Sequence, residues 1–191
     1  CAGSNKKRGG KDSLGLVTIA DHLHDIAENS INAGAKNVSI SIKETNEIFY
    51  FSIKDDAGGI RPDIFERIFD PFTTTRKKEI RRVGLGLPFL KKSTEMTGGY
   101  TKISTELGKG TNTEALFYKS HIDCQPVGNL PDVFLVLLLN TQINWNIQRC
   151  YNDECYTIDS NTIKSYIGDL DNPQKIAILR DLLVELESSF V

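Results

Sequence analysis

The chain has 191 residues, enough for one domain of ordinary size and an appendage. Its composition, 39% hydrophobic and 25% charged with a formal net charge of −2, excludes a disordered or fibrous protein and gives no support to nucleic-acid binding. The longest apolar run, Val133 to Leu139, is far shorter than the roughly 20 residues of a membrane-spanning helix, so no membrane contact is expected. Four cysteines are too few for a disulfide scaffold, which favours the cytoplasm.

The first third of the chain predicts an arm, a helix and a pair of strands. Residues 1–13 hold glycines and basic side chains but almost no apolar ones, and we expect a mobile N-terminal arm there. A helix begins at Ile19, because apolar positions recur at the spacing of one helix face, and Gly34 supplies a stop. That face comprises Ile19, Leu23, Ile26, Ala27 and Ser30. Residues 38–42 and 49–53 alternate apolar and polar, which predicts a hairpin of two half-buried strands.

The middle of the chain mixes helix and strand. A polar, glycine-spaced stretch over 55–87 leads into a second helix over 88–97, and strands are predicted over 100–106 and 112–120. This mixture favours an α+β fold with helices on one face of a mixed, mostly antiparallel sheet.

The composition of the sequence changes after Asp123. Pro126, Gly128 and Pro131 mark a linker, and a short helix over 132–140 and a hairpin over 143–158 follow. Two terminal helices are expected, one after Ser160 and one after Asn172-Pro173. The expected parts are an arm over 1–13, a domain over 14–120 and a small α/β C-terminal extension over 121–191, to which the sequence assigns no chemistry.

Two polar side chains of the first helix could act together. Asp25 and Asn29 lie four residues apart, so they project from one helix face. An amide oxygen could ligate Mg²⁺, while the carboxylate could orient or deprotonate a water. A solvated polar face is the alternative interpretation.

Three further segments have the composition of ligand-binding loops. Asp55 shares the parity of the buried side chains of its strand, so this carboxylate points to the apolar side and needs a partner, which an adenine amino group would provide. The alternative is a tight turn capped by the aspartate. Residues 84–87 (Gly-Leu-Gly-Leu) offer backbone amides to phosphate ahead of a helix, and residues 108–111 (Gly-Lys-Gly-Thr) alone would indicate only a hairpin turn.

The order and spacing of these segments resemble the GHKL (histidine kinase-like, Bergerat) ATP-binding fold of DNA gyrase B subunits, MutL, heat-shock chaperones and histidine kinases. Residues 25–35 are similar to the N box of that family, closest to the MutL form, and residues 55–60 to its first glycine box. Residues 68–76 resemble the F box of histidine kinases, 84–87 the second glycine box and 108–111 the last motif. The resemblance covers residues 16 to about 118 and implies a two-layer α/β sandwich that binds ATP and Mg²⁺.

The resemblance also implies roles for individual residues. Asn29 would ligate Mg²⁺, Asp55 would read adenine and Gly59 would give the base room. Thr111 would support the Asp55 contact, and Arg76 with the backbone of Gly84 and Gly86 would meet the phosphates. The implied nucleotide-binding set is Asn29, Asp55, Gly59, Ile60, Thr75, Arg76, Gly84, Leu85, Gly86, Leu87 and Thr111, with Asp25 as the catalytic residue.

What the chain does with ATP stays open between alternatives. Hydrolytic members of the family carry glutamate where this chain has Asp25, which is one methylene shorter. One expectation is an ATPase or a histidine or serine protein kinase in signalling, with a protein partner or phosphoacceptor. The alternatives are a nucleotide-gated interaction module without turnover and a MutL-like ATPase. A homodimer is left open.

A metal site independent of nucleotide is a further hypothesis. His121, Cys124, Cys150 and Cys155 could hold zinc if their two segments meet. Alternatively, Cys150 and Cys155 face each other across a turn.

Overall fold

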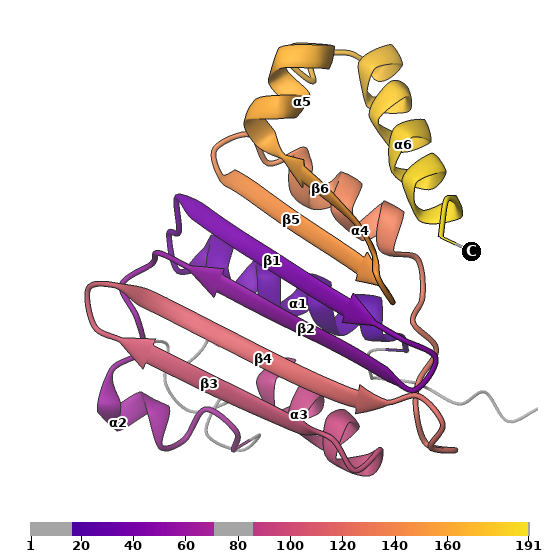
Figure 1. Cartoon of the computed structure of the whole chain (residues 1–191). Helices are drawn as coiled ribbons and strands as arrows, with labels where there is room; N and C mark the ends of the chain where they lie inside the picture. The colour runs from indigo at the N-terminus through magenta and orange to yellow at the C-terminus, as the bar shows by residue number, and fades with distance from the viewer. Residues whose placement is uncertain (1–16, 71–85, 191) are drawn as a thin grey trace, which may run out of the picture.

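The computed structural model describes residues 17–70 and 86–190 (Figure 1). Its helices are α1 (Ile19–Asn32), α2 (Pro62–Phe65), α3 (Gly86–Met96), α4 (Leu130–Leu138), α5 (Ser160–Ile167) and α6 (Pro173–Ser188). Its strands are β1 (Asn37–Glu44), β2 (Ile48–Asp55), β3 (Tyr100–Glu106), β4 (Gly110–Tyr118), β5 (Asn144–Tyr151) and β6 (Glu154–Asp159).

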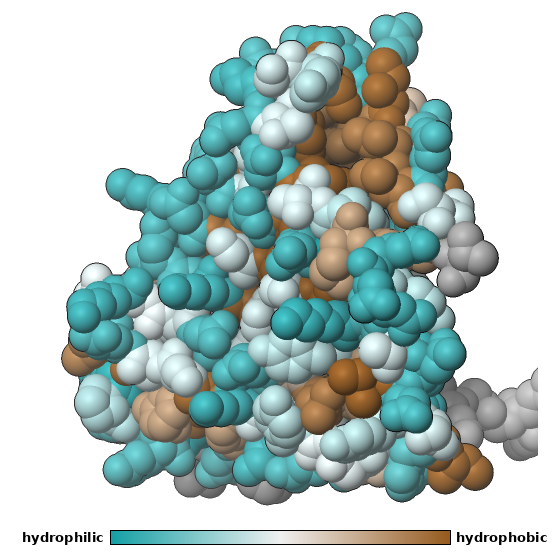
Figure 2. All heavy atoms as spheres, viewed as in Figure 1, coloured by the Kyte–Doolittle hydropathy of each residue, from teal (hydrophilic) through white to brown (hydrophobic). Residues whose placement is uncertain are grey.

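The strands form one six-stranded sheet in the order β3-β4-β2-β1-β5-β6. Every neighbouring pair is antiparallel except β1 and β5, which run parallel. Helices α1, α3 and α4 lie on one face of the sheet, and the side chains visible on the other face are mostly hydrophilic (Figures 1 and 2). The predicted α+β class with a mixed, mostly antiparallel sheet is confirmed.

Alternation of side chains along β1 and β2 creates the core. Val38, Ile40 and Ile42 are at most 1% exposed, while the polar residues between them point to the open face. The same alternation in β2 buries Phe49 and Phe51. Because one face of the sheet is apolar and the other polar, the pairing register of this hairpin is fixed by burial.

Helix α1 closes the core from the helical side and has well-defined ends. Thr18 and Asp21 form a capping box at its start, which satisfies backbone N–H groups that a helix leaves unpaired. Gly34 follows its end with a φ of 82°, a conformation that favours glycine. The first two helical N–H groups donate to the carbonyl groups of Pro126 and Val127, so the linker after β4 runs against the start of α1.

The C-terminal elements continue the sheet of the preceding domain. β5 pairs with β1 along its whole length, and β6 pairs with β5. The sequence predicted this hairpin and its flanking helices but not their attachment to β1. It also missed α2, and α3 begins at Gly86 rather than at Pro88.

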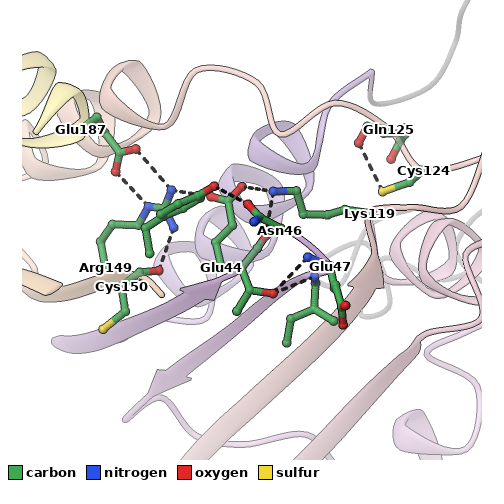
Figure 3. Close-up of polar contacts among 12 residues, drawn as sticks. Glu44, Asn46, Glu47, Lys119, Cys124, Gln125, Arg149, Cys150 and Glu187 are labelled. Atoms are coloured by element: carbon green, nitrogen blue, oxygen red, sulfur yellow. Dashed lines mark hydrogen bonds and ion pairs between the residues drawn. The ribbon is translucent and has the colours of Figure 1, made fainter. Parts of the chain in front are cut away.

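A buried charge network fastens α6 to the sheet (Figure 3). Arg149 on β5 is 3% exposed and donates hydrogen bonds to Glu44 on β1 at 2.5 Å and to Glu187 on α6 at 2.9 Å. Lys119 Nζ donates to the other Glu44 oxygen at 2.6 Å, and the Tyr156 hydroxyl donates to Glu187 at 2.6 Å. Since Arg149 is the cation that pairs with Glu187, removing Arg149 would leave the Glu187 carboxylate without a charged partner among the described residues.

The hypothesis of a zinc site is wrong. Cys150 and Cys155 lie opposite each other in the β5–β6 register and form a disulfide, so they face each other across a turn. Cys124 is a free, half-buried thiol, and the backbone N–H of Asp123 donates to His121 Nδ1 at 3.1 Å. Residues 17–70 and 86–190 contain no group of three His, Cys, Asp or Glu side chains placed to hold a metal ion. In the same ranges, no helix is both long and apolar enough to cross a bilayer.

Candidate functional site

Asp55 ends β2 with its carboxylate fixed by three hydrogen bonds. Ser30 on α1 donates its hydroxyl to Oδ2 at 2.7 Å. The backbone N–H groups of Ala57 and Thr111 donate to Oδ1 at 3.0 and 3.3 Å. The carboxylate therefore lies on the apolar side of the sheet, as strand parity predicted, and its orientation is set before any ligand arrives.

A cavity of about 580 Å³ opens in front of Asp55, between β2, β4, α1 and the start of α3. Its volume lies in the range of small-molecule binding sites. It is lined by Ile26, Asn29, Ser30, Ala33, Asp55, Ala57, Gly58, Gly59, Ile60, Arg61, Ile64, Leu87, Thr111 and Thr113. Apolar side chains and glycines make up more than half of this lining, and Ser30 and Thr111 contact Asp55, an arrangement that suits a mainly apolar ligand with a hydrogen-bond donor at the end that meets Asp55.

Gly59 is required in the wall of the cavity by its conformation and by its surroundings. Its φ is 76°, and a Cβ placed on it would lie 2.5 Å from the backbone oxygen of Glu106. The next residue, Ile60, donates its N–H to the Thr105 hydroxyl at 2.8 Å. The Thr105 hydroxyl in turn lies 3.2 Å from that of Thr111, so the loop after β2 is tied to β3 and β4.

Asp25 and Asn29 of α1, which the sequence predicts to act together, lie in different surroundings in the structure. Asn29 lines the cavity, but Asp25 does not. Asp25 Oδ2 is buried without a hydrogen-bond partner in the described part of the chain, and a Cβ on Gly86 would lie 1.5 Å from it. The first turn of α3 thus covers this carboxylate. Burial raises the pKa of Asp25, and the negative charge of Glu28 adds to the increase, while His24 opposes it.

The residues predicted to meet the phosphates are only partly described. Thr75, Arg76, Gly84 and Leu85 lie outside the described residues. Leu87 lines the cavity, whereas Gly86 packs on Asp25 and is not part of the lining.

Sequence reasoning missed several contributors to the site. It interpreted Ser30 as part of the apolar helix face, and the residue is indeed 4% exposed, but its hydrogen bond to Asp55 was not predicted. A hydroxyl at a core position of a helix was the available signal, because a buried hydroxyl needs a partner. Thr113, Arg61 and Ile64 also line the cavity without having been predicted there.

A bound Mg²⁺ is compatible with the donor groups present. The carboxamide of Asn29 is an oxygen donor at the cavity wall, and Mg²⁺ in nucleotide sites takes few protein ligands because phosphates and waters fill most of its coordination shell. If Mg²⁺ binds in this cavity, Asn29 would be a residue that holds it.

Comparison with known proteins matches this region to one family. The family described as "Histidine kinase-, DNA gyrase B-, and HSP90-like ATPase" matches residues 12–120. The sensor histidine kinase WalK of Bacillus subtilis (strain 168) is 33% identical over 109 residues, which are 53% of this chain and 18% of WalK. The sensor kinase CckA of Brucella abortus (strain 2308) is 42% identical over 62 residues, 32% of this chain and 6% of CckA.

Two DNA repair proteins are also similar. The DNA mismatch repair protein MutL of Clostridium perfringens (strain 13 / Type A) is 38% identical over 57 residues, 30% of this chain and 8% of MutL. The crystal structure of the N-terminal domain of a DNA repair protein aligns with a TM-score of 0.56 and 14% identity, covering 84% of this chain and 59% of that one. This likeness concerns the fold alone. The chain matches less than a fifth of the length of each of the three curated relatives.

Proposed function

Because the chain belongs to the family of histidine kinase-, DNA gyrase B- and HSP90-like ATPases, an ATP-binding family, we propose that its cavity binds ATP with Mg²⁺ and that Asp55 recognises the adenine. The observation that carries the proposal is the Asp55 carboxylate, which three hydrogen bonds fix at the polar part of the cavity. A fixed acceptor selects a ligand with a donor at that point, as the exocyclic amine of adenine provides.

Other residues would contact the base, the metal ion and the phosphates. The apolar walls formed by Ile26, Ile60 and Leu87 contact the faces of the base, and Gly59 leaves room for its edge. Asn29 ligates Mg²⁺ from α1. By the family resemblance, Thr75, Arg76 and the backbone of residues 84–86 bind the phosphates. We propose the cytoplasm as its location because ATP is abundant there, although the Cys150–Cys155 disulfide is of a kind that is rare in that reducing compartment.

The fate of the nucleotide depends on Asp25. We propose an ATPase or a protein kinase of the histidine or serine type in signalling, with Asp25 as the base that activates the attacking water or hydroxyl. A base must reach the reacting group, yet the Asp25 carboxylate is covered by Gly86. Turnover therefore requires the first turn of α3 to move away. This observation favours, as the second candidate, a module that binds ATP without turnover.

Two measurements test the proposal. Isothermal titration of the full chain with ATP, with and without Mg²⁺, should give saturable binding that Mg²⁺ strengthens, and GTP should bind much more weakly. Asn29→Ala should remove the effect of Mg²⁺ while leaving nucleotide binding without metal in place. Absence of ATP binding, or equal affinity for GTP, would contradict the adenine assignment.

Incubation with γ-labelled ATP and cell extract then separates the two candidates. Free labelled phosphate indicates an ATPase, labelled protein indicates a kinase, and neither product indicates the module without turnover. Asp25→Asn should bind ATP as the wild type does but abolish any turnover. Turnover at the wild-type rate in this variant would exclude Asp25 as the base.

A further inference from the structure

Charge is distributed unevenly along the chain. Residues 121–191 carry ten acidic and four basic side chains, whereas residues 1–120 carry fifteen and nineteen. The C-terminal extension therefore has a net negative charge, whereas the rest of the chain has a net positive charge. Such a field attracts partners of the opposite sign.

The cations of the extension already have partners within the chain. Arg149 belongs to the buried network with Glu44 and Glu187. The other pairs are Lys164 with Asp169, Lys175 with Asp171 and Arg180 with Asp132. Two exposed carboxylates of α6, Asp181 and Glu185, have no hydrogen bond or ion pair to any residue of 17–70 or 86–190. They lie four residues apart and so form a short acidic row on the helix.

An apolar stripe runs beside this acidic row. Ile178, Leu182 and Leu186 follow at intervals of four on α6, and we call them the α6 stripe. Ile178 is 56% and Leu182 39% exposed, and Leu186 is partly buried against the core. Hydrophobic side chains gather on the surface where α5 and α6 lie, at the top of the view in Figure 2. An exposed apolar surface of this kind, bordered by charge, is typical of a protein-binding site.

We propose that α6 binds a cationic amphipathic helix of a partner protein, whose apolar side chains pack on the α6 stripe and whose lysines or arginines pair with Asp181 and Glu185. The intervals of four residues match the spacing at which a docked helix presents its own apolar face. A second copy of the chain fits less well, because two α6 helices packed on their stripes would bring their unneutralised carboxylates together.

This surface is separate from the nucleotide cavity. The cavity is built from α1, β2, β4 and α3, while α6 lies beyond β6 at the other end of the strand order (Figure 1). Both can therefore be occupied at once, and the inference does not depend on ATP binding.

The test uses the full chain and a designed peptide as the probe. A fluorescein-labelled helical peptide of about 14 residues carries leucines on one face and lysines on the other, and a matched peptide carries glutamates in place of the lysines. Fluorescence anisotropy should show saturable binding of the lysine peptide and at least about tenfold weaker binding of the glutamate peptide. Ile178→Gln, and separately Asp181→Lys with Glu185→Lys, should each weaken the lysine peptide at least about fivefold.

Matched controls separate this site from general attraction to an acidic protein. Val136→Gln changes an apolar side chain of similar exposure (51%) on α4 and should leave the affinity unchanged. Asp153→Lys with Glu154→Lys changes the net charge by the same amount at the β5–β6 turn and should weaken binding less than the α6 pair does. Circular dichroism confirms that each variant is folded.

The proposal is overturned if the lysine peptide does not bind up to about 100 µM, or if the control variants weaken it as much as the α6 variants do. Sedimentation provides a further outcome. If the chain forms a dimer that Ile178→Gln dissociates, a second copy occupies the stripe, and the partner-helix proposal is wrong.

Discussion

In the proposed site, recognition of the base rests on the single carboxylate of Asp55, so its replacement by the isosteric amide is the most direct test at the scale of one residue. In Asp55→Asn, an amide nitrogen would take the place of one acceptor oxygen and would face either the backbone N–H groups of Ala57 and Thr111 or the adenine amine, all of which are donors. We expect ATP affinity to fall at least tenfold, about 1.4 kcal/mol, measured by isothermal titration. An unchanged affinity would remove Asp55 from the adenine contact.

Ser30→Ala separates orientation of the carboxylate from its presence. The variant removes the 2.7 Å hydrogen bond to Oδ2 but keeps the two backbone bonds to Oδ1. We expect a loss in ATP binding of about 0.5–1.5 kcal/mol, clearly smaller than that of Asp55→Asn. If Ser30→Ala weakens ATP as strongly as Asp55→Asn, the hydroxyl itself contacts the nucleotide.

Two adjacent glycines give a matched pair of variants. Gly59→Ala places a Cβ 2.5 Å from the Glu106 carbonyl at a φ of 76°, whereas Gly58→Ala meets nothing within 4 Å. We expect Gly59→Ala to lower the free energy of unfolding by about 1–3 kcal/mol and to impair ATP binding, with Gly58→Ala close to wild type. Urea unfolding followed by circular dichroism measures the difference, and equal stabilities would show that the loop adapts.

At the scale of elements, His22 joins α1 to the linker that follows β4. The side chain is 1% exposed beside Phe117, and its Nε2 lies 2.8 Å from Gln125 Oε1. Burial lowers the pKa of His22, and the hydrogen bond to Gln125 and the charge of Asp21 offset this only in part. With Nε2–H donating to Gln125, Nδ1 stays buried without a partner in the described part of the chain.

The lowered pKa makes stability depend on pH in one direction. Above about pH 6.5 the imidazole is neutral in both states, so its contribution is fully present. As pH falls through 6.5 towards the folded-state pKa, the unfolded chain binds a proton that the folded one does not, and stability is lost. We expect the urea midpoint of the wild type to fall between about pH 7.5 and 5.5, and His22→Gln to reduce this dependence. The more exposed His24, changed to Gln, is the control, and an equal reduction there would contradict the assignment.

Local patterns in the sequence predicted most elements and only part of their arrangement. Strands β1 and β2 follow from alternation within each strand, and the helical periodicity from Ile19 predicted α1. The pairing of β1 with β5 joins residues far apart in the chain, and no periodicity encodes such a contact. The covering of Asp25 by Gly86 was missed for a similar reason, because spacing places a side chain on a helix face but not beneath another helix.

At the scale of the whole molecule, the extension covers the edge of the family domain. A chain ending at residue 120 would leave the edge of β1 unpaired and remove Arg149, one of the two cationic partners of Glu44. We expect this truncated chain to aggregate or to unfold at a markedly lower temperature than the full chain, since an open apolar edge promotes pairing with other chains. Solubility and thermal unfolding measure this. A soluble truncated chain that binds ATP with wild-type affinity would show the extension to be dispensable for folding.

The parallel pairing of β1 with β5 also has a consequence during synthesis of the protein on the ribosome. Asn37 and Asn144, which open the ladder, are 107 residues apart, so β1 leaves the ribosome long before its neighbour exists. At a synthesis rate of about 5–20 residues per second, the edge of β1 stays without its partner strand β5 for roughly 5–20 seconds. During that interval, the nearest extended chains able to pair with β1 are those growing on adjacent ribosomes of the same message.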